Sequence, residues 1–219
     1  MIKKIIVALV VFWTWNAQAQ FIIGGNLAYQ IPFGADKNFT GVQLLLEKPV
    51  NERNSYYGKV SAFFPQKISL ANAYVADALD FNTEPQSVNL SAMTNFSSFD
   101  VEFGRRGYII NPIDYGFALY GSSTITMSFN TVKSRIQSYD KTKYQIYGVD
   151  NDANVNGKGN IFNLGFGVSG GAKYDFNFGT FYADVSLGYS FLQLASNSIA
   201  QQAYTSFGSR LNSGIGIGY

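Results

Sequence analysis

The last stretch of the chain alternates strictly between two kinds of side chain. From position 207 to 219 every second residue is apolar, aromatic or serine, ending on Ile215, Ile217 and Tyr219, while the positions between them are mostly glycine and include Arg210. Side chains of a β-strand point alternately to opposite faces, so this period of two predicts a strand with one apolar face and one small or polar face. Such a strand needs partners whose faces match its own.

Seven further segments alternate in the same way, at lengths near the ~9–11 residues with which a tilted strand crosses a bilayer. Together with the last stretch they predict eight strands, at residues 21–33, 41–50, 55–64, 98–110, 115–129, 161–174, 180–191 and 205–219. Tight turns follow the second, fourth and sixth strands, whereas longer polar connections, including loops at 65–97 and 130–160, follow the others. We therefore predict an all-β fold, an eight-stranded antiparallel up-and-down transmembrane β-barrel with extracellular long loops and both termini periplasmic. A secreted β-sandwich also alternates, but it does not require this alternation of connection lengths.

The first residues have the layout of a secretory signal peptide. Lys3 and Lys4 precede an apolar run, and Ala17-Gln18-Ala19 forms a small-x-small cleavage site. The apolar run is shorter than the ~20 residues of a spanning helix. We expect residues 1–19 to be removed and residues 20–219 to form the barrel in the cell outer membrane.

The terminal strand resembles the C-terminal signal strand of bacterial outer-membrane β-barrels, which their assembly machinery recognises. In that resemblance Leu211, Ile215, Ile217 and Tyr219 form the assembly signal. The whole layout is similar to the small barrels of the OmpA-transmembrane, OmpX and OmpW type, and the Ala-Gln-Ala-Gln start is similar to PorT-like outer-membrane β-barrel proteins of Bacteroidota. The implied partners are the barrel-assembly machinery, outer-membrane lipids and lipopolysaccharide, and other outer-membrane proteins. No functional residue of these families carries over.

The inward faces of the predicted strands carry matched charges. The acids are Glu47, Asp100, Glu102 and Asp184, and the bases are Lys59, Arg106, Lys173 and Arg210. Eight strands enclose a lumen that side chains just fill, and an unpaired charge there is costly. We expect these residues to form an ion-pair network that fills the lumen; a proton or ion path through them is the alternative.

The fourth strand leaves its register open. Strict alternation turns Arg105 toward lipid, which would cost up to ~2–4 kcal/mol at mid-bilayer. A bulge at residues 105–107 would instead turn Tyr108 and Ile110 outward and at least one arginine inward.

The absence of His and Cys excludes histidine-dependent triads, thiol chemistry and His-type zinc sites. We predict no catalytic residue, no cofactor and no enzymatic activity. Without Lys3 and Lys4 the chain has equal numbers of acidic and basic residues, which gives no reason to expect a nucleic-acid partner.

The two long loops contain candidate contact residues. In the 65–97 loop, apolar residues recur at a helical spacing: Leu70, Ala73, Tyr74, Ala78 and Phe81. This spacing predicts a short amphipathic helix, which would cap the barrel mouth or dock a partner. The 130–160 loop contains basic residues interleaved with tyrosines: Lys133, Arg135, Lys141 and Lys143. These side chains could contact lipopolysaccharide phosphates or a partner protein; the alternative is that they are exposed to solvent without a partner.

The same loop contains a weak calcium candidate. Asp150, Asp152 and Asn154 place oxygen atoms at alternate positions, as calcium loops do. The sixth position is Val155 rather than Gly and the twelfth is Ile161 rather than Glu, so a solvated surface loop without metal is favoured.

Three functions remain open. The first is a non-enzymatic barrel that acts through protein or lipid contacts, including as an accessory subunit of an outer-membrane assembly or secretion complex. The second, implied by the OmpW resemblance, is a narrow conduit for small hydrophobic molecules. The third, implied by the OmpX resemblance, is a surface adhesin, which predicts strands that continue far above the membrane.

Overall fold

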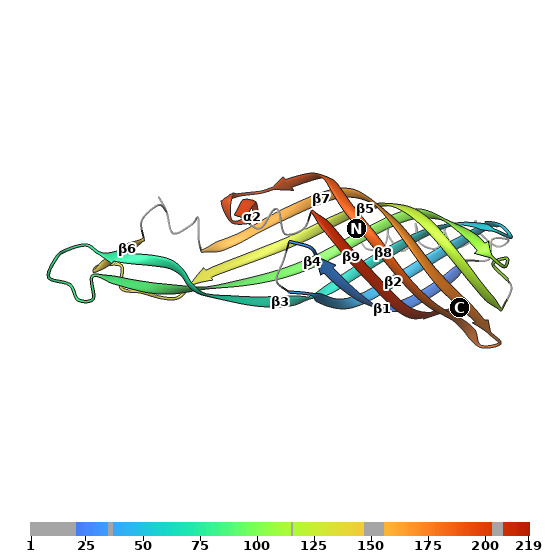
Figure 1. The fold of residues 1–219 in the computed structure, drawn as a ribbon, viewed down its shortest axis with the longest axis horizontal. Helices are drawn as coiled ribbons and strands as arrows, with labels where there is room; N and C mark the ends of the chain where they lie inside the picture. The colour runs from blue at the N-terminus through green and yellow to red at the C-terminus, as the bar shows by residue number, and fades with distance from the viewer. Residues whose placement is uncertain (1–20, 35–36, 115, 147–155, 203–207) are drawn as a thin grey trace, which may run out of the picture.

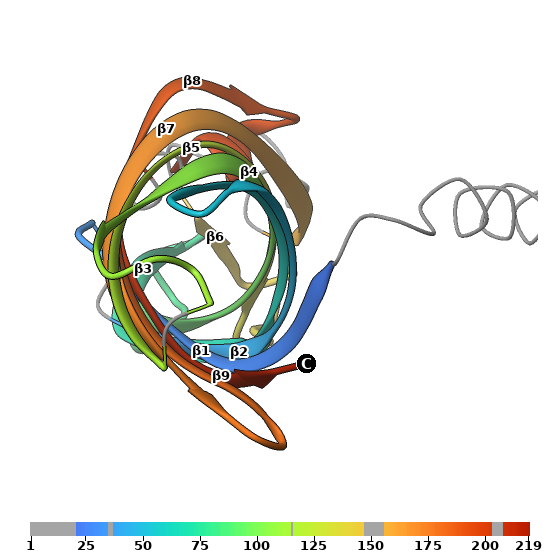
Figure 2. The ribbon, with the colours of Figure 1, turned by 90° about the vertical axis from the view of Figure 1, so that its right-hand side faces the viewer.

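Eight strands of the computed structural model close into a ring, and a ninth short strand joins the sheet beyond it (Figure 1, Figure 2). The structure describes residues 21–34, 37–114, 116–146, 156–202 and 208–219. The elements are β1 (Ile22–Pro32), β2 (Phe39–Asn51), β3 (Asn54–Ala78), β4 (Ser87–Ile110), β5 (Phe117–Ile136), β6 (Tyr144–Ile146), β7 (Gly157–Phe176), β8 (Gly179–Ala195), α2 (Ser198–Gln202) and β9 (Ser209–Gly218). The predicted fold class, an eight-stranded antiparallel barrel, is confirmed. The predicted signal peptide, residues 1–19, lies outside the described residues.

The ring closes between the first and last strands. β1 pairs antiparallel with β9, from Gly24 opposite Gly218 to Pro32 opposite Arg210. β2 pairs with β3 as well as with β1, so neither edge of the sheet is left open within the ring. The connections β2–β3, β4–β5 and β7–β8 all lie at the end of the barrel where β9 ends, and the longer connections lie at the opposite end (Figure 1).

The two faces of the sheet differ in chemistry, as the alternation predicts. Large apolar side chains on the outward face are solvent-exposed, among them Leu27, Leu44, Phe103, Ile125, Phe166, Val168, Ile215 and Ile217. An apolar surface of this extent is unfavourable in water and is the lipid-facing wall of a membrane barrel. No helix of the described residues is long and apolar enough to cross a membrane.

The register of β4 settles the position of Arg105. β4 pairs without interruption with β3 from Phe99 to Gly107, so Arg105 faces outward and Arg106 inward. The alternative of a bulge at residues 105–107 was wrong, because the irregularity in β4 lies between Tyr108 and Ile110, and Tyr108 points inward. Arg105 is tolerated on the outer wall because it lies near the turn end, where its guanidinium donates to Asn54 Oδ1 at 3.0 Å.

A bulge also explains why the alternation of β8 inverts after Phe191. Leu164 of β7 lies opposite Leu192, while the next residue, Gly165, lies opposite Ser190. Phe191 is therefore the extra residue of a bulge, and Leu192 and Leu194 return to the outward face. β8 continues to Ala195 instead of ending at Phe191.

Strands β3 and β4 continue well beyond the ring. Pairing of β3 with β2 ends at Phe63, whereas its pairing with β4 runs on from Gln66 opposite Phe96 to Asp77 opposite Ser87. These ~10 further residues at ~3.3 Å each extend the hairpin by about 30 Å. Figure 1 shows the hairpin projecting beyond the ring. Most of the 65–97 segment that we expected to be a loop is thus strand, and the amphipathic helix predicted there was wrong. Both ends of the 130–160 loop are strand as well, since β5 and β7 extend into it.

The end of this hairpin is a small sheet with its own core, which we call the distal sheet: residues 74–92, 136–146. Beyond Ile136 the chain leaves the β4 edge and returns as β6, which pairs with β3 from Ala76 to Ala78. One face of the hairpin is thereby covered, and a buried cluster forms from Ala76, Leu90, Ile136 and Ile146, with Tyr74, Val88, Tyr139 and Tyr144 packed around it. This burial, together with the ladder to β4, stabilises strand over helix in this segment.

The lumen end nearest the distal sheet is covered by α2. Ile199 and Ala200 of α2 are buried in a cluster with inward-facing apolar side chains of the barrel: Ala28, Phe39, Phe63, Val132 and Ile161. The capping element thus comes from the β8–β9 connection and not from the 65–97 segment. Asn197 fixes the start of this helix, because its Oδ1 accepts from the Ala200 amide at 3.0 Å.

Two adjacent glycines of β7 provide a test of this packing. A Cβ at Gly171 would lie 2.5 Å from the Tyr120 ring and 2.6 Å from the Ala183 oxygen, whereas a Cβ at Gly170 would meet nothing closer than 3.9 Å. We predict that Gly171→Ala lowers the free energy of unfolding by ~1–3 kcal/mol through overpacking, and that Gly170→Ala changes it by well under ~1 kcal/mol. Urea titration, read from the electrophoretic shift between folded and unfolded barrel, measures both; equal values for the two variants would contradict the packing described.

Candidate functional site

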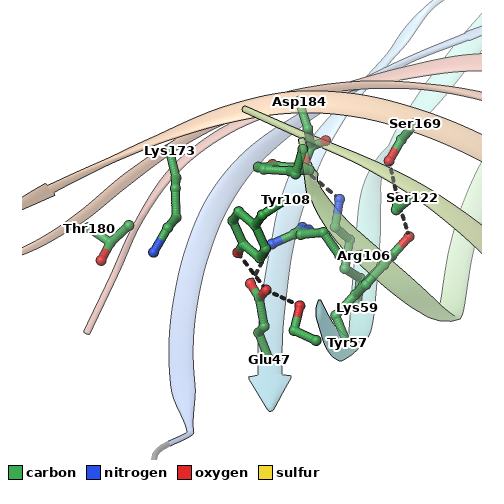
Figure 3. Close-up of polar contacts among 12 residues, drawn as sticks. Glu47, Tyr57, Lys59, Arg106, Tyr108, Ser122, Ser169, Lys173, Thr180 and Asp184 are labelled. Atoms are coloured by element: carbon green, nitrogen blue, oxygen red, sulfur yellow. Dashed lines mark hydrogen bonds and ion pairs between the residues drawn. The ribbon is translucent and has the colours of Figure 1, made fainter. Parts of the chain in front are cut away.

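The centre of the lumen contains a buried arginine–glutamate pair (Figure 3). Arg106 of β4 donates through Nη1 to Glu47 Oε2 of β2, and both side chains are fully buried. Glu47 also accepts from the Tyr108 hydroxyl at 2.7 Å and from the Ser55 hydroxyl. The carboxylate thus has three donors, from the strands β3 and β4, which is the condition under which a buried charge is tolerated.

Aromatic rings surround the other side of Arg106. Its Cζ lies 4.0 Å from the ring centroid of Tyr120, 4.9 Å from that of Tyr57 and 6.0 Å from that of Tyr182. Nε and Nη2 have no hydrogen-bond partner among the described residues, so the ring faces are the remaining source of stabilisation for this side of the cation. Arg106 therefore fills the lumen cross-section as well as pairing with Glu47.

A second ion pair lies beside the first. Lys59 of β3 donates to Asp184 of β8 at 2.7 Å, across the lumen, with both side chains almost fully buried. Next to it, Tyr57 hydrogen-bonds Ser122 at 3.0 Å and Ser122 hydrogen-bonds Ser169 (Figure 3). Polar contacts across the lumen thereby join side chains of β3, β5, β7 and β8.

A third polar group lies closer to the capped end. Arg210 of β9 donates to Ser128 Oγ at 2.5 Å and lies 3.6 Å from Asp100 Oδ2. Asp100 also accepts from Gln30 at 3.1 Å and from Ser98 at 3.3 Å. A neighbouring chain of neutral groups links β1, β2 and β3 through Asn26, Gln43 and Ser61.

The eight charged residues chosen from the sequence are all buried inside the barrel, but they are not all paired with one another. Three pairs form within the set: Glu47–Arg106, Asp184–Lys59 and Asp100–Arg210. Lys173 instead pairs with Asp175 at 2.9 Å, and Glu102, opposite Lys59 in the β3–β4 register, forms no ion pair in the described structure. Asp175 was not among the predicted lumen residues because it was expected in a turn, whereas β7 runs through it to Phe176.

Buried apolar and aromatic side chains fill the lumen around the ion pairs and at its capped end. On the turn side, Leu45, Tyr57 and Tyr182 form one buried cluster and Tyr108, Ile113, Ala118 and Tyr120 form another, with Ile22 packed against both. The rings of Tyr57, Tyr120 and Tyr182 in these clusters are the ones that lie around Arg106. At the opposite end α2 and its partners form the cluster described above. Ion pairs and apolar side chains together give a filled lumen.

The described residues contain no group of three or more His, Cys, Asp or Glu side chains placed to hold a metal ion. The lumen carboxylates that form ion pairs are tied to bases and hydroxyls in structural contacts. The calcium candidates Asp150, Asp152 and Asn154 lie outside the described residues.

The tip of the distal sheet exposes a large aromatic side chain. Phe81 is 96% exposed and the nearby Leu79 is 53% exposed. The turn that carries them is held by Asp80, which accepts from the Asn82 amide at 2.9 Å and from the Thr83 hydroxyl at 2.8 Å. The Thr83 hydrogen bond in particular lowers the pKa of Asp80. The tip therefore presents apolar side chains on an ordered turn.

The tip is also tied to the β5–β6 connection. The Leu79 amide donates to the Lys143 oxygen at 2.8 Å, and the Tyr144 hydroxyl donates to the Pro85 oxygen at 3.1 Å. Asp140 accepts from the Thr142 hydroxyl at 2.6 Å, which lowers the pKa of its carboxyl. The distal sheet is thus held together by hydrogen bonds as well as by its apolar core.

The candidate assembly residues lie on the outer wall of β9 and at its end. Ile215, Ile217 and Tyr219 are exposed, and Leu211 is partly exposed opposite Leu187 of β8. The Tyr219 amide and oxygen both hydrogen-bond the backbone of Ile23 on β1.

Comparison with known proteins identifies the fold. No protein-family model and no curated protein matches the sequence. Similar solved structures include Neisserial surface protein A, at 8% identity and a TM-score of 0.52 over 91% of this chain and 97% of that chain. Another is a major outer membrane protein from Thermus thermophilus, at 11% identity and a TM-score of 0.50 over 92% of this chain and 98% of that chain. The likeness shows the fold of a small outer-membrane β-barrel.

Removing Arg106 tests whether the central pair stabilises the barrel. In Arg106→Met the Glu47 carboxylate stays buried with only hydroxyl donors, and we predict a loss of ~3–5 kcal/mol in the free energy of unfolding. Arg105→Met, the adjacent outward residue, is the matched control and should cost less than ~1 kcal/mol. Urea unfolding of both in the same detergent gives the comparison.

The double variant Glu47→Gln with Arg106→Met completes this test. It removes both charges, so it should be more stable than Arg106→Met alone. If the loss of unfolding free energy in the double variant equals the sum of the losses in Glu47→Gln and Arg106→Met, the two side chains are not coupled and the pair does not stabilise the barrel as described.

Proposed function

We propose that this chain is a non-enzymatic integral outer-membrane protein that acts by binding another protein through its distal sheet, outside the barrel. The observation that carries the proposal is the β3–β4 hairpin, which outgrows the ring by about 30 Å and ends in a sheet with its own buried core. A hairpin that served only to connect two barrel strands would need neither this length nor this core.

The filled lumen supports a function outside the barrel. Ion pairs such as Glu47–Arg106 and Lys59–Asp184 occupy its centre, and α2 covers one end. A conduit for small hydrophobic molecules, as the OmpW resemblance implies, would need an apolar passage. The buried charges weigh against one.

The tip of the distal sheet has the properties of a protein-binding surface. Phe81 and Leu79 are exposed apolar side chains on a turn that Asp80 fixes, with Lys143 and Asp140 close by. Exposed aromatic anchors on a rigid element carry a large share of binding energy at protein interfaces, and charged neighbours add specificity. Binding to a host or matrix protein, as an adhesin, and binding to another surface protein of the same cell, as an accessory subunit, both use this surface.

The layout of the barrel supports the placement in the membrane that this function requires. The apolar outer wall and the segregation of tight turns to one end favour the outer membrane, with the distal sheet outside the cell and both termini periplasmic. Removal of residues 1–19, assembly through Leu211, Ile215, Ile217 and Tyr219, and kinship with PorT-like proteins of Bacteroidota rest on the sequence and belong to the same proposal.

Single cysteines at Phe81 and Phe178 test on which side of the outer membrane each end of the barrel lies, which the binding function requires. The chain contains no Cys, so each introduced thiol is its only one. Both residues are strongly exposed, at 96% and 75%, but Phe178 lies in the β7–β8 turn at the opposite end of the barrel. In intact cells we predict that Phe81→Cys reacts with a membrane-impermeant maleimide and that Phe178→Cys reacts only after the outer membrane is permeabilised.

The same two variants, coupled to a photoactivatable maleimide cross-linker, locate the partner. We predict a discrete adduct at position 81 that is lost when Leu79→Ser is added, and no such adduct at position 178. A thiol at position 81 that reacts freely with maleimide yet yields no adduct in the native environment would overturn the binding function. An adduct at position 178 alone would move the function to the periplasmic side.

A further inference from the structure

Four basic side chains form a band on the outer wall just above the apolar zone. Lys67 of β3 lies opposite Asn95 of β4, Asn95 lies opposite Lys133 of β5, and Lys133 lies opposite Lys158 of β7. Residues directly opposite in neighbouring antiparallel strands share a face of the sheet. Arg135, two residues beyond Lys133 on the same face, completes what we call the basic band: Lys67, Lys133, Arg135 and Lys158.

The band lies directly beyond a row of aromatic side chains. Phe99, Phe129 and Phe162 are opposite one another on β4, β5 and β7, with ring centroids 6.4 and 5.3 Å apart. Lys133 and Lys158 are each four residues beyond this row, about 13 Å along the strand and about 10 Å along the membrane normal at the usual barrel tilt. Aromatic girdles mark the membrane interface, so extended lysine side chains from this height reach back to the level of the lipid phosphates.

The charges of the band are not balanced by the protein within the described structure. All four side chains are exposed, and none of them forms an ion pair among the described residues. On these strands the nearest described acidic residue on the same face is Asp77, which lies opposite Ser87 of β4. Ser87 is about 20 Å along β4 from Met93, the residue opposite Arg135 of the band. That separation exceeds the screening length at physiological salt.

Like charges directly opposite each other on a sheet destabilise it. Lys133 and Lys158 occupy such a pair of positions, next to the apolar wall. An external anion at the level of the membrane interface would attract both lysines and so offset their repulsion.

We propose that the basic band binds the phosphorylated headgroup of an outer-leaflet lipopolysaccharide, whose acyl chains lie along the aromatic row below it. The band spans three interstrand spacings from β3 to β7, about 14 Å, which is wider than one phosphate and suits a headgroup with more than one. The same surface combines the cations and the apolar wall that such an amphiphile requires. This site is separate from the distal sheet and does not depend on its binding function.

The full-length protein in neutral detergent, supplied with diphosphorylated lipid A, tests the site. Native mass spectrometry counts the lipid molecules retained and gives their affinity. We predict that Lys133→Gln with Lys158→Gln weakens retention about 25-fold, from about fivefold for each charge removed near an anionic headgroup. Lys48→Gln with Arg53→Gln removes two charges at the opposite end of the barrel, and it should change retention by less than about twofold.

Two further readouts separate a lipid site from a structural role. Without lipid, Lys133→Gln with Lys158→Gln should unfold at the same or a higher temperature than the parent protein, because it removes a repulsive pair; a lower temperature would show a structural role and overturn the assignment. Phosphatidylglycerol, with a single phosphate, should be retained more weakly than lipid A. Equal retention of the two lipids, or equal loss in both double variants, would also overturn it.

Discussion

A β-sheet that crosses a bilayer has to close on itself, because lipid offers no hydrogen-bond partner to an open edge. In this chain the closure is the pairing of β1 with β9, which completes a ring of eight strands. The number of strands then fixes the width of the lumen at a size that side chains fill. The remaining features of the molecule follow from that narrow interior.

A narrow interior of low polarity favours charges that are paired. Glu47 with Arg106, Lys59 with Asp184 and Asp100 with Arg210 satisfy this condition, and the tyrosine rings around Arg106 complete the filling. With the lumen occupied, recognition has to use surfaces outside it. β3 and β4 extend beyond the ring by about 30 Å and carry a separately packed sheet. In the function that we propose, the barrel is the anchor and the distal sheet is the binding element. The basic band, at the boundary between the two, would fix the anchor in the leaflet.

The sequence predicts the parts of this structure that depend on a period of two. The eight strands, the inward position of Arg106 and the outward position of Ile217 follow from alternation alone. Local irregularities do not: the bulges at Phe191 and between Tyr108 and Ile110 each shift the alternation by one residue, and only the partner strand shows where.

The extension of β3 was missed because a polar, amphipathic segment above the membrane no longer carries the apolar face by which a spanning strand is recognised. Its core depends on Ile136 and Ile146, which lie beyond β4 in the sequence. The pairing of Lys173 with Asp175 was missed because a turn was placed where β7 still continues.

The lumen is filled, and we propose that the protein acts from outside it. Single-channel recording of the purified full-length protein in planar bilayers tests the filled lumen most directly. We expect no steady open conductance across the accessible range of voltage, because ion pairs, the aromatic and apolar clusters around them and the cap formed by α2 occupy the path. A stable, reproducible open conductance of the folded barrel would contradict it.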